Sequence, residues 1–406
     1  MGDTERLSRV ITEAIHRSIR VGWDKLHGPE DGASKERCVT FRDYMAMCLY
    51  DERDGYYRSG TIRVGRAGDF YTSSSIGSIM AAKLADFISK LADGQEGRIS
   101  ILEWGAGTGR LSRQLLSAWQ TVSPAWFNRM TYSLVDGNPV HLKESRNRLK
   151  EQHAEDAAPA VRCLTPEEAE EELRTEREME RAAGTYTILL ANELLDAFPV
   201  HRVVMRNGKL WELGVGLRTS AANDRLQPSS GAHFREVYMP LSDPRIEDVL
   251  RRDGITLREG QILEVNLHAE EWIGQMSRLI GSGSMVLIDY GHEAMELAAP
   301  HRMLGTLLCY KDHIARDEPY QLPGEQDMTA HVNFTACMAA AAAAGWRVDY
   351  YHTQKQFLVD QGLLSDLMDH TGADPFSEAA RNNRAIRQLL LSDTMSETFK
   401  VLVLGK

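Results

Sequence analysis

The stretch ILEWGAGTGRLSRQLL, residues 101–116, places glycines at alternate positions directly after an apolar run. The apolar run predicts a buried strand, and the spacing of the leucines in LSRQLL predicts the helix that follows it. Glycine allows backbone conformations that other residues avoid, and its missing side chain lets the main chain approach a ligand closely. The stretch therefore predicts a ligand-binding loop at the junction of a strand and a helix.

The spacing of the glycines narrows the choice of ligand. Gly105, Gly107 and Gly109 form the pattern G-x-G-x-G, and Arg110 follows them. The dinucleotide fingerprint is G-x-G-x-x-G, whose third glycine is needed for close packing of the helix. A phosphate-binding P-loop requires G-K-S or G-K-T, which does not follow here. The spacing therefore argues against both of these loops.

Strands and helices alternate from residue 99 onward. The predicted strands are ISILEWG, MTYSLVD, AVRCL, YTILLA, SMVLIDYG, WRVDYYHT and FKVLVLG. Helices are predicted in GRLSRQLLSAW, VHLKESRNRLKEQ and LHAEEWIGQMSRLIG, which lie between these strands. Such alternation is typical of an α/β protein, in which helices cover both faces of a largely parallel sheet.

Three segments lie outside this alternation. The first 30 residues predict an amphipathic helix with apolar residues at helical spacing, namely Leu7, Val10, Ile11, Ala14, Ile15 and Ile19. Residues 165–184 carry a dense run of charges and predict a solvated helix. Residues 200–245 favour short strands and turns, with Asn207-Gly208 as a hairpin turn.

These patterns predict how the chain is divided. We expect N-terminal helices and a lid loop over 1–75, and a hairpin-rich substrate-side insertion over 200–254. The expected core comprises 76–199 and 255–406. The apolar N-terminal helix would pack on its own domain or on a second subunit, which leaves a homodimer open.

Acidic residues at the strand ends suit a cofactor that carries an ammonium group and a ribose. Glu103, at the end of the first strand, can attract an ammonium directly or through water. Asp136, at the end of the second strand, is placed to accept hydrogen bonds from ribose hydroxyls. Asp69 and Thr72, in the loop GRAGDFYTSSS, are candidates for a lid over the cofactor, although the loop's glycines also suit an ordinary turn.

Three polar residues follow the most apolar strand. The segment ANELLDAFP places Asn192, Glu193 and Asp196 at the carboxyl end of this strand, where open α/β sheets bind their ligands. Asn192 alone could cap a helix. The full group favours a role in binding the second substrate, with Glu193 and Asp196 as the catalytic acids.

Composition and charge exclude several classes of function. Lys and Arg number 47 against 58 Asp and Glu, a net charge of −11, which argues against a nucleic-acid surface. No apolar run is long enough to span a membrane, and the N-terminus lacks an apolar signal core. The five cysteines show no C-x-x-C pair, and the histidines show no metal-binding spacing. We therefore expect a cytoplasmic protein without a metal.

The motifs together resemble a known family. GDFYTSS, EWGAGTGRL, ANELLDAFPV, LIDYG, GTLLCY and PGEQDMTAHVNF occur in this order across residues 68–334. This arrangement is similar to that of the MidA family of methyltransferases, whose eukaryotic members are mitochondrial complex I assembly factors. The chain departs from the family pattern in VDGNP, where a Glu-x-Ser-like sequence is expected, and in the length of the insertion at 165–184.

The resemblance implies a seven-stranded, Rossmann-like class I methyltransferase sheet with S-adenosylmethionine as donor. For the eukaryotic members it also implies methylation of a protein arginine, so a respiratory-complex subunit is one expected partner. The family's glycine loop falls on Gly105, Gly107 and Gly109. Its motif after the fourth strand includes Asn192, Glu193 and Asp196.

Three other functions remain open at this point. The methyl acceptor could be a small molecule, although the long insertions favour a large one. The chain could be an assembly or scaffolding protein that retains a cofactor fold, but its intact glycines and polar strand end argue against lost activity. A nicotinamide oxidoreductase is disfavoured by the glycine spacing.

Overall fold

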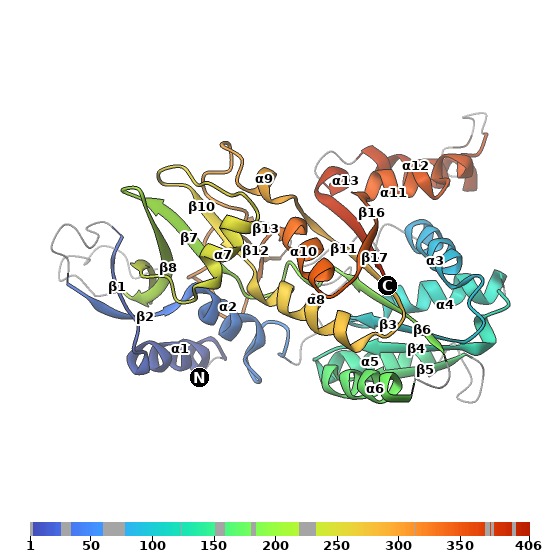
Figure 1. The fold of residues 1–406 in the computed structure, drawn as a ribbon, viewed down its shortest axis with the longest axis horizontal. Coiled ribbons are helices and arrows are strands. Elements are labelled where there is room, and N and C mark those ends of the chain that lie inside the picture. Colours follow the sequence, from blue (N-terminus) through green and yellow to red (C-terminus); the bar gives the residue numbers. More distant parts are fainter. Residues whose placement is uncertain are drawn as a thin grey trace. The chain divides into compact units, whose positions relative to one another are not determined.

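The computed structural model describes residues 3–25, 34–59, 78–122, 124–150, 159–179, 184–218, 233–312, 314–369, 374, 377–391 and 395–406. The chain divides into two compact units (Figure 1). Unit 1 comprises Met1–Gly60, Leu195–Glu271 and Gly291–Cys337, and unit 2 comprises Thr61–Leu194, Trp272–Tyr290 and Met338–Lys406.

Unit 2 is built on a seven-stranded path in the order β16-β17-β11-β6-β3-β4-β5. All neighbours pair in parallel except β17, which is antiparallel to both β11 and β16. The prediction of a seven-stranded α/β sheet is therefore confirmed. The strands are β3 (Arg98–Trp104), β4 (Met130–Val135), β5 (Ala160–Leu164), β6 (Thr185–Asn192), β11 (Gly283–His292), β16 (Arg347–Thr353) and β17 (Phe399–Gly405).

Helices of unit 2 bury apolar stripes against this sheet. On α4 the stripe consists of Leu111, Leu115, Leu116 and Trp119, and the Trp119 indole N–H donates to the carbonyl of Ala85 on α3 at 3.0 Å. Figure 1 shows α3 and α4 side by side. The helices are α3 (Ser78–Ala92), α4 (Arg110–Val122), α5 (Pro139–Lys150), α6 (Pro166–Met179), α11 (Gln354–Asp360), α12 (Glu378–Leu391) and α13 (Met395–Thr398), with 3-10 turns η3 (Phe127–Arg129) and η4 (Leu363–Asp366).

Strands from distant parts of the sequence form the sheet of unit 1. Its order is β10-β7-β8-β2-β1-β9, and β9 also pairs with β8, so that β8, β2, β1 and β9 close into a ring. The predicted hairpin at Asn207-Gly208 is confirmed, because both residues have positive φ and β7 pairs with β8 around them. The strands are β1 (Val21–Asp24), β2 (Glu36–Thr40), β7 (His201–Arg206), β8 (Lys209–Leu217), β9 (Phe234–Met239) and β10 (Ile262–Val265).

Unit 1 also contains a three-stranded sheet and several helices. The small sheet has the order β13-β12-β14, formed by β13 (Ile314–Arg316), β12 (Leu308–Lys311) and β14 (Asp327–Thr329). A further strand, β15 (Val332–Asn333), pairs with the last residues of β11. The helices are α1 (Asp3–Arg17), α2 (Phe41–Tyr50), α7 (Arg245–Arg252) and α9 (Ala294–Leu297), and α8 (Leu267–Leu279) and α10 (Phe334–Ala343) run from unit 1 into unit 2.

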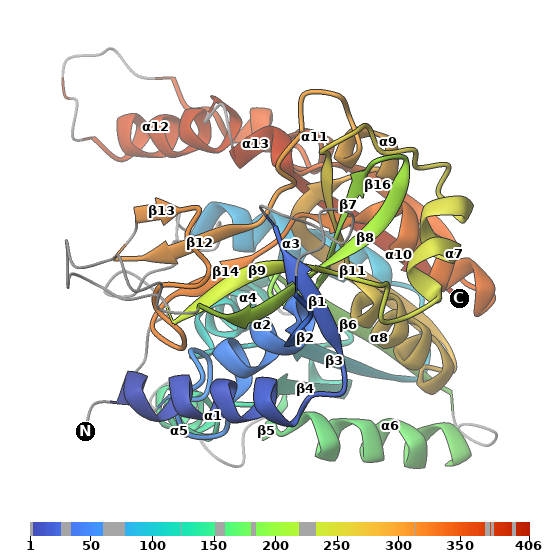
Figure 2. The same cartoon turned by 90° about the vertical axis from the view of Figure 1, so that its left-hand side faces the viewer.

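The N-terminal helix is shorter than its apolar pattern predicts. Leu7, Ile11 and Ile15 of α1 are buried in the core of unit 1, and α1 lies beside β2 (Figure 2). Ile19 is 95% exposed, because the helix ends at Arg17. The inclusion of Ile19 in the apolar face was therefore wrong.

The two units divide the chain differently from the expected boundaries. Residues 255–271 and 291–337, which were expected in the methyltransferase core, belong to unit 1. These residues belong to unit 1 partly because β10 pairs with β7 and because the three-stranded sheet packs on α2. Both β7 and α2 are elements of unit 1. In the described part of the chain, no helix has the length and apolarity needed to cross a membrane.

Candidate active site

The glycine loop of unit 2 requires glycine for its backbone conformation. Gly105, Gly107 and Gly109 have φ values of +75°, +56° and +70°, a region that residues with a side chain rarely adopt. A Cβ at Gly105 would lie 3.0 Å from the Leu194 side chain, and one at Gly109 would lie 3.0 Å from the Leu134 side chain. The loop between the end of β3 and the start of α4 therefore requires glycine at these positions, both for its backbone conformation and for the close approach of Leu194 and Leu134.

Asp136 fastens this loop to the end of β4. Its Oδ2 accepts a hydrogen bond from the backbone N–H of Gly107 at 2.8 Å, and its Oδ1 accepts one from Asn138 N–H at 2.7 Å. Nδ1 of the buried His141 on α5 lies 3.4 Å from Asp136 Oδ1. Asp136 therefore shapes the cofactor loop, in addition to the ribose contact predicted for it.

Glu103 is more deeply buried than expected for a residue that contacts a ligand through a water molecule. Its side chain is 4% exposed, and its Oε2 accepts hydrogen bonds from the Ser112 hydroxyl on α4 and, at 2.6 Å, from the Tyr132 hydroxyl on β4. Burial raises the pKa of Glu103 to about 7, although both hydrogen bonds act to lower it. Glu103 therefore ties β3, β4 and α4 together, and carries a full charge only above neutral pH.

Asn192 and Glu193, which were predicted to bind the second substrate, lie in a strained turn at the end of β6. Glu193 has φ +53°, an uncommon conformation for a residue other than glycine, and such strain concentrates at functional sites. Its backbone N–H donates to the carbonyl of Ile288 on β11, and the Asn192 side-chain amide donates to Glu193 Oε1 at 3.2 Å. The carboxylate of Asp289 holds the next residue by accepting from Leu194 N–H at 3.1 Å.

The remaining sequence-predicted residues are not part of this cluster. Asp196 lies in unit 1, where it is buried and its carbonyl accepts a hydrogen bond from Ala330 N–H at 3.0 Å. Asp69 and Thr72 fall outside the described residues. Unit 2 thus brings together the glycine loop with Glu103 and Asp136, and separately positions Asn192 and Glu193 at the end of β6.

Sequence reasoning missed the residues that support the site. Ser112 and Tyr132 are the partners of Glu103, and Ser145 on α5 donates from its hydroxyl to the Gly107 carbonyl at 3.0 Å. The spacing of Ser112 on the α4 helix places it in the buried stripe with Leu111 and Leu115, a position where a hydroxyl needs a partner. This buried hydroxyl is the one signal in the sequence that could have identified Ser112 as a residue that supports the site.

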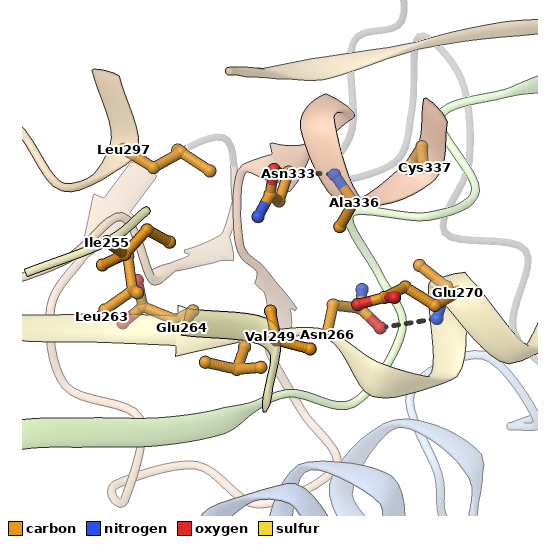
Figure 3. Close-up of a pocket in the computed structure, with 12 residues that line it drawn as sticks. Val249, Ile255, Leu263, Glu264, Asn266, Glu270, Leu297, Asn333, Ala336 and Cys337 are labelled. Carbon is orange, nitrogen blue, oxygen red and sulfur yellow. Dashed lines mark hydrogen bonds between the residues drawn. The ribbon is translucent and has the colours of Figure 1, made fainter. Parts of the chain in front are cut away.

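A separate cavity in unit 1 is too small to receive a methyl acceptor. Its volume is about 10 Å³, which leaves room for about one water molecule. Figure 3 shows Asn266 and Asn333 at its wall. Both side chains serve as helix caps, because Asn266 accepts from Ala269 N–H at the start of α8 and Asn333 accepts from Ala336 N–H at the start of α10. The cavity is a packing feature.

Comparison with known families identifies the chemistry of the site. Residues 79–352 match the profile of Methyltransf_28, a family described as S-adenosyl-L-methionine-dependent methyltransferases. The chain belongs to this family. S-Adenosylmethionine is accordingly the methyl donor. The described loop fits it, since Gly105, Gly107 and Gly109 share a backbone conformation with positive φ and present no side chain to a ligand.

Relatives with curated names cover most of the chain. A protein arginine methyltransferase NDUFAF7 homolog of Drosophila melanogaster is 26% identical over 76% of this chain and 67% of its own length. Protein arginine methyltransferase NDUFAF7 of Rattus norvegicus is 25% identical over 90% of this chain and 80% of its own length. Both are mitochondrial proteins by name. The suspected MidA-like membership is therefore confirmed.

A solved structure agrees with the fold over the whole chain. A candidate methyl transferase from Burkholderia thailandensis, bound to S-adenosyl-homocysteine, aligns with a TM-score of 0.79 and 27% identity and covers 100% of this chain and 92% of that one. A native structure of a protein from the same organism aligns with a TM-score of 0.76. The methyltransferase fold implied by the resemblance of the motifs is the fold of these proteins.

Proposed function

We propose that this methyltransferase transfers the methyl group of S-adenosylmethionine to an arginine side chain of a protein partner. The observation that carries the proposal is the similarity of the chain to proteins named as arginine methyltransferases over most of its length. The family's cofactor chemistry is common to many acceptors, so the assignment of the acceptor rests on these relatives and on Glu193, which directly follows β6.

The chemistry of the acceptor explains why a carboxylate is needed at this position. A guanidinium remains protonated at neutral pH and is then a poor nucleophile. A carboxylate that accepts hydrogen bonds from it localises its charge away from the attacking nitrogen. Glu193 is rigidly placed for this task, because its backbone is bonded to β11 and its Oε1 accepts from Asn192.

We assign orientation of the acceptor to Glu193 and assistance to Asp196, three residues further along the chain. S-Adenosylmethionine supplies an electrophilic methyl group on a sulfonium. The attacking nitrogen forms the new N–C bond as the S–C bond breaks, and the acceptor then loses one proton, which a carboxylate accepts directly or through water. Much of the rate enhancement comes from alignment of the nucleophile, which a fixed carboxylate provides.

Methyl transfer from labelled S-adenosylmethionine into a cell lysate tests the proposal. The labelled products are separated by size, and the labelled protein fraction is hydrolysed to amino acids. The proposal predicts label in protein and recovery of the label as methylarginine. Label confined to small molecules would support a small-molecule acceptor instead, and a chain that binds the donor but transfers no label would support a scaffolding role.

A further inference from the structure

Two motifs of the sequence, GTLLCY and PGEQDMTAHVNF, belong neither to the glycine loop nor to the segment that follows β6. The structure brings them together in the three-stranded sheet of unit 1, where β12 pairs with β14 (Figure 2). Tyr310 of the first motif lies directly opposite Asp327 of the second in this pair of strands. A tyrosine and an acid from separate motifs therefore meet at one position of unit 1.

A second tyrosine is hydrogen-bonded to Asp327. The Tyr57 hydroxyl, from the segment that follows α2, donates to Asp327 Oδ1 at 2.7 Å, and the same oxygen accepts from Met328 N–H at 2.8 Å. Asp327 is 1% exposed, whereas Tyr57 and Tyr310 are both partly exposed. The carboxylate is therefore fixed inside unit 1, and the two tyrosines are the members of the group that solvent reaches.

The segment ANELLDAFP reaches the same part of unit 1. The backbone N–H of Ala330, in the second of these motifs, donates to the Asp196 carbonyl at 3.0 Å. The Tyr50 hydroxyl donates to the Ala197 carbonyl at 3.0 Å, and the ring centroids of Tyr50 and Tyr57 lie 5.6 Å apart. Asp196, to which we assign assistance of the acceptor, thus shares its surroundings with Tyr57 and with the end of β14.

The electrostatics of the two tyrosines place both carboxylates near them. Burial raises the pKa of Tyr57 well above its ordinary value, and the carboxylates of Asp327 and Asp196 add to this shift. Burial also raises the pKa of Tyr310, and Asp196 and Asp327 again contribute. Both phenols therefore keep their protons, and the two acids supply a negative potential around them.

Acids beside aromatic rings form surroundings that suit a guanidinium. The face of a tyrosine ring is negative and attracts a cation, most often that of arginine. The planar guanidinium also pairs with carboxylates and stacks on aromatic rings. A neutral acceptor carries no charge for either interaction. The group therefore favours a cationic acceptor.

We infer that Asp196, Asp327, Tyr57 and Tyr310 form the part of unit 1 that receives the guanidinium of the acceptor arginine. The partly exposed rings of the two tyrosines contact the acceptor, and the acids supply the negative potential. Asp327 is a positioning residue, because it holds the Tyr57 hydroxyl. The inference rests on the proposed arginine acceptor and separates its recognition in unit 1 from the binding of the donor by the glycine loop of unit 2.

A dilution series of cell lysate, supplied with labelled S-adenosylmethionine and analysed for methylarginine, measures recognition of the acceptor. The lysate concentration that gives half the maximal rate reports the acceptor KM, and the plateau reports kcat. Asp327→Asn removes the charge that holds Tyr57 and should raise the half-maximal concentration about tenfold, the loss of one charged hydrogen bond. Asp360→Asn is the matched control, because Asp360 accepts from the Tyr350 hydroxyl at the same 2.7 Å in unit 2. This control should leave the half-maximal concentration unchanged.

Substitutions of Tyr310 separate recognition of a cation from packing. Tyr310→Leu removes the aromatic face and should raise the half-maximal concentration about fivefold, whereas Tyr310→Phe keeps the ring and should change it little. A role in packing alone would lower the free energy of unfolding, measured with urea, and leave the half-maximal concentration as it is. Titration with S-adenosylhomocysteine should give the same donor affinity in all of these variants.

The unmodified chain separates this inference from the proposed function. Methylarginine formed by the unmodified chain supports the proposed function, and its absence would overturn both. If methylarginine forms, equal half-maximal concentrations in Asp327→Asn and Asp360→Asn would overturn this inference alone. If Asp327→Asn does not fold, the Tyr310 variants decide in its place, and equal half-maximal concentrations in Tyr310→Leu and Tyr310→Phe would contradict the inference.

Discussion

The carboxylate of Asp136 accepts a hydrogen bond from the backbone N–H of Gly107 at 2.8 Å, and thereby joins the end of β4 to the middle of the cofactor loop. The other oxygen of Asp136 is bonded to Asn138 N–H at 2.7 Å. The acid at the end of β4 thus fixes the conformation of a loop that begins 31 positions earlier in the chain, at Gly105. A carboxylate oxygen has two lone pairs, so both can still accept from a ribose hydroxyl.

Replacement of Asp136 should therefore weaken donor binding in two ways. Asp136→Ala removes the predicted ribose contact and releases Gly107, and we expect a loss of roughly 1.5–3 kcal/mol in the binding free energy of S-adenosylhomocysteine. Calorimetry measures this loss directly. Asp93→Ala, at an exposed turn after α3, is the matched control and should leave the affinity unchanged. A loss in Asp136→Ala below about 0.5 kcal/mol would remove Asp136 from the cofactor site.

The buried carboxyl of Glu103 should make stability depend on pH. Burial raises its pKa to about 7, above its value in the unfolded chain, so the folded state binds the proton more tightly. Stability contributed by this group is therefore present at acid pH and is lost as the pH rises through about 7. The total loss is on the order of 3 kcal/mol for a shift of this size.

Glu103→Gln removes this titration while it keeps the shape of the side chain. Urea unfolding at mildly acidic and mildly alkaline pH measures the free energy of unfolding of both chains. As the pH rises, we expect the free energy of unfolding of Glu103→Gln to increase relative to that of the unmodified chain. Stability curves of the two chains that stay parallel across this range would show that Glu103 is ionised throughout.

The acids proposed for the acceptor should affect turnover and leave donor binding unchanged. Glu193→Gln and Asp196→Asn each retain side-chain size but lose the charge that pairs with a guanidinium. We expect turnover on the acceptor to fall by about a hundredfold or more, roughly 3 kcal/mol, with little change in donor affinity. Rates of methyl transfer and calorimetry with S-adenosylhomocysteine provide the two measurements.

An exposed acid serves as the control for this pair of substitutions. Glu96→Gln, before β3, should transfer methyl groups at the normal rate. Near-normal turnover in both Glu193→Gln and Asp196→Asn would remove the physical support for an arginine acceptor. A small-molecule acceptor would then be the better explanation.

The local features of unit 2 could be predicted because each has a local signal. The strand–loop–helix around Gly107 follows from an apolar run, glycine spacing and helical periodicity, all within 16 residues. The strand that ends at Asn192 is an apolar run followed by polar residues. The number of strands then follows from the resemblance to the family, and the structure has a seven-stranded path.

The architecture of unit 1 could not be predicted in the same way. Cys38 on β2 pairs with Gly216 on β8, and Trp23 on β1 pairs with Tyr238 on β9. The register between strands so far apart in the sequence is set by tertiary packing and leaves no periodic pattern in either strand alone. The polar partners of Glu103 were missed for the same reason, since Tyr132 meets it only when β4 pairs with β3.

Titration of the chain and its Gly107→Val variant with S-adenosylhomocysteine tests the central claim most directly, namely that the loop of residues 105–109 binds the methyl donor. Gly107 has φ +56°, which a β-branched residue cannot adopt without strain. Gly94→Val is the matched control, because Gly94 also has a positive φ, of +82°, but lies in a turn with nothing within 4 Å of its added Cβ. We predict that Gly94→Val binds as the unmodified chain does and that folded Gly107→Val shows no binding. Undiminished affinity in folded Gly107→Val would contradict the account.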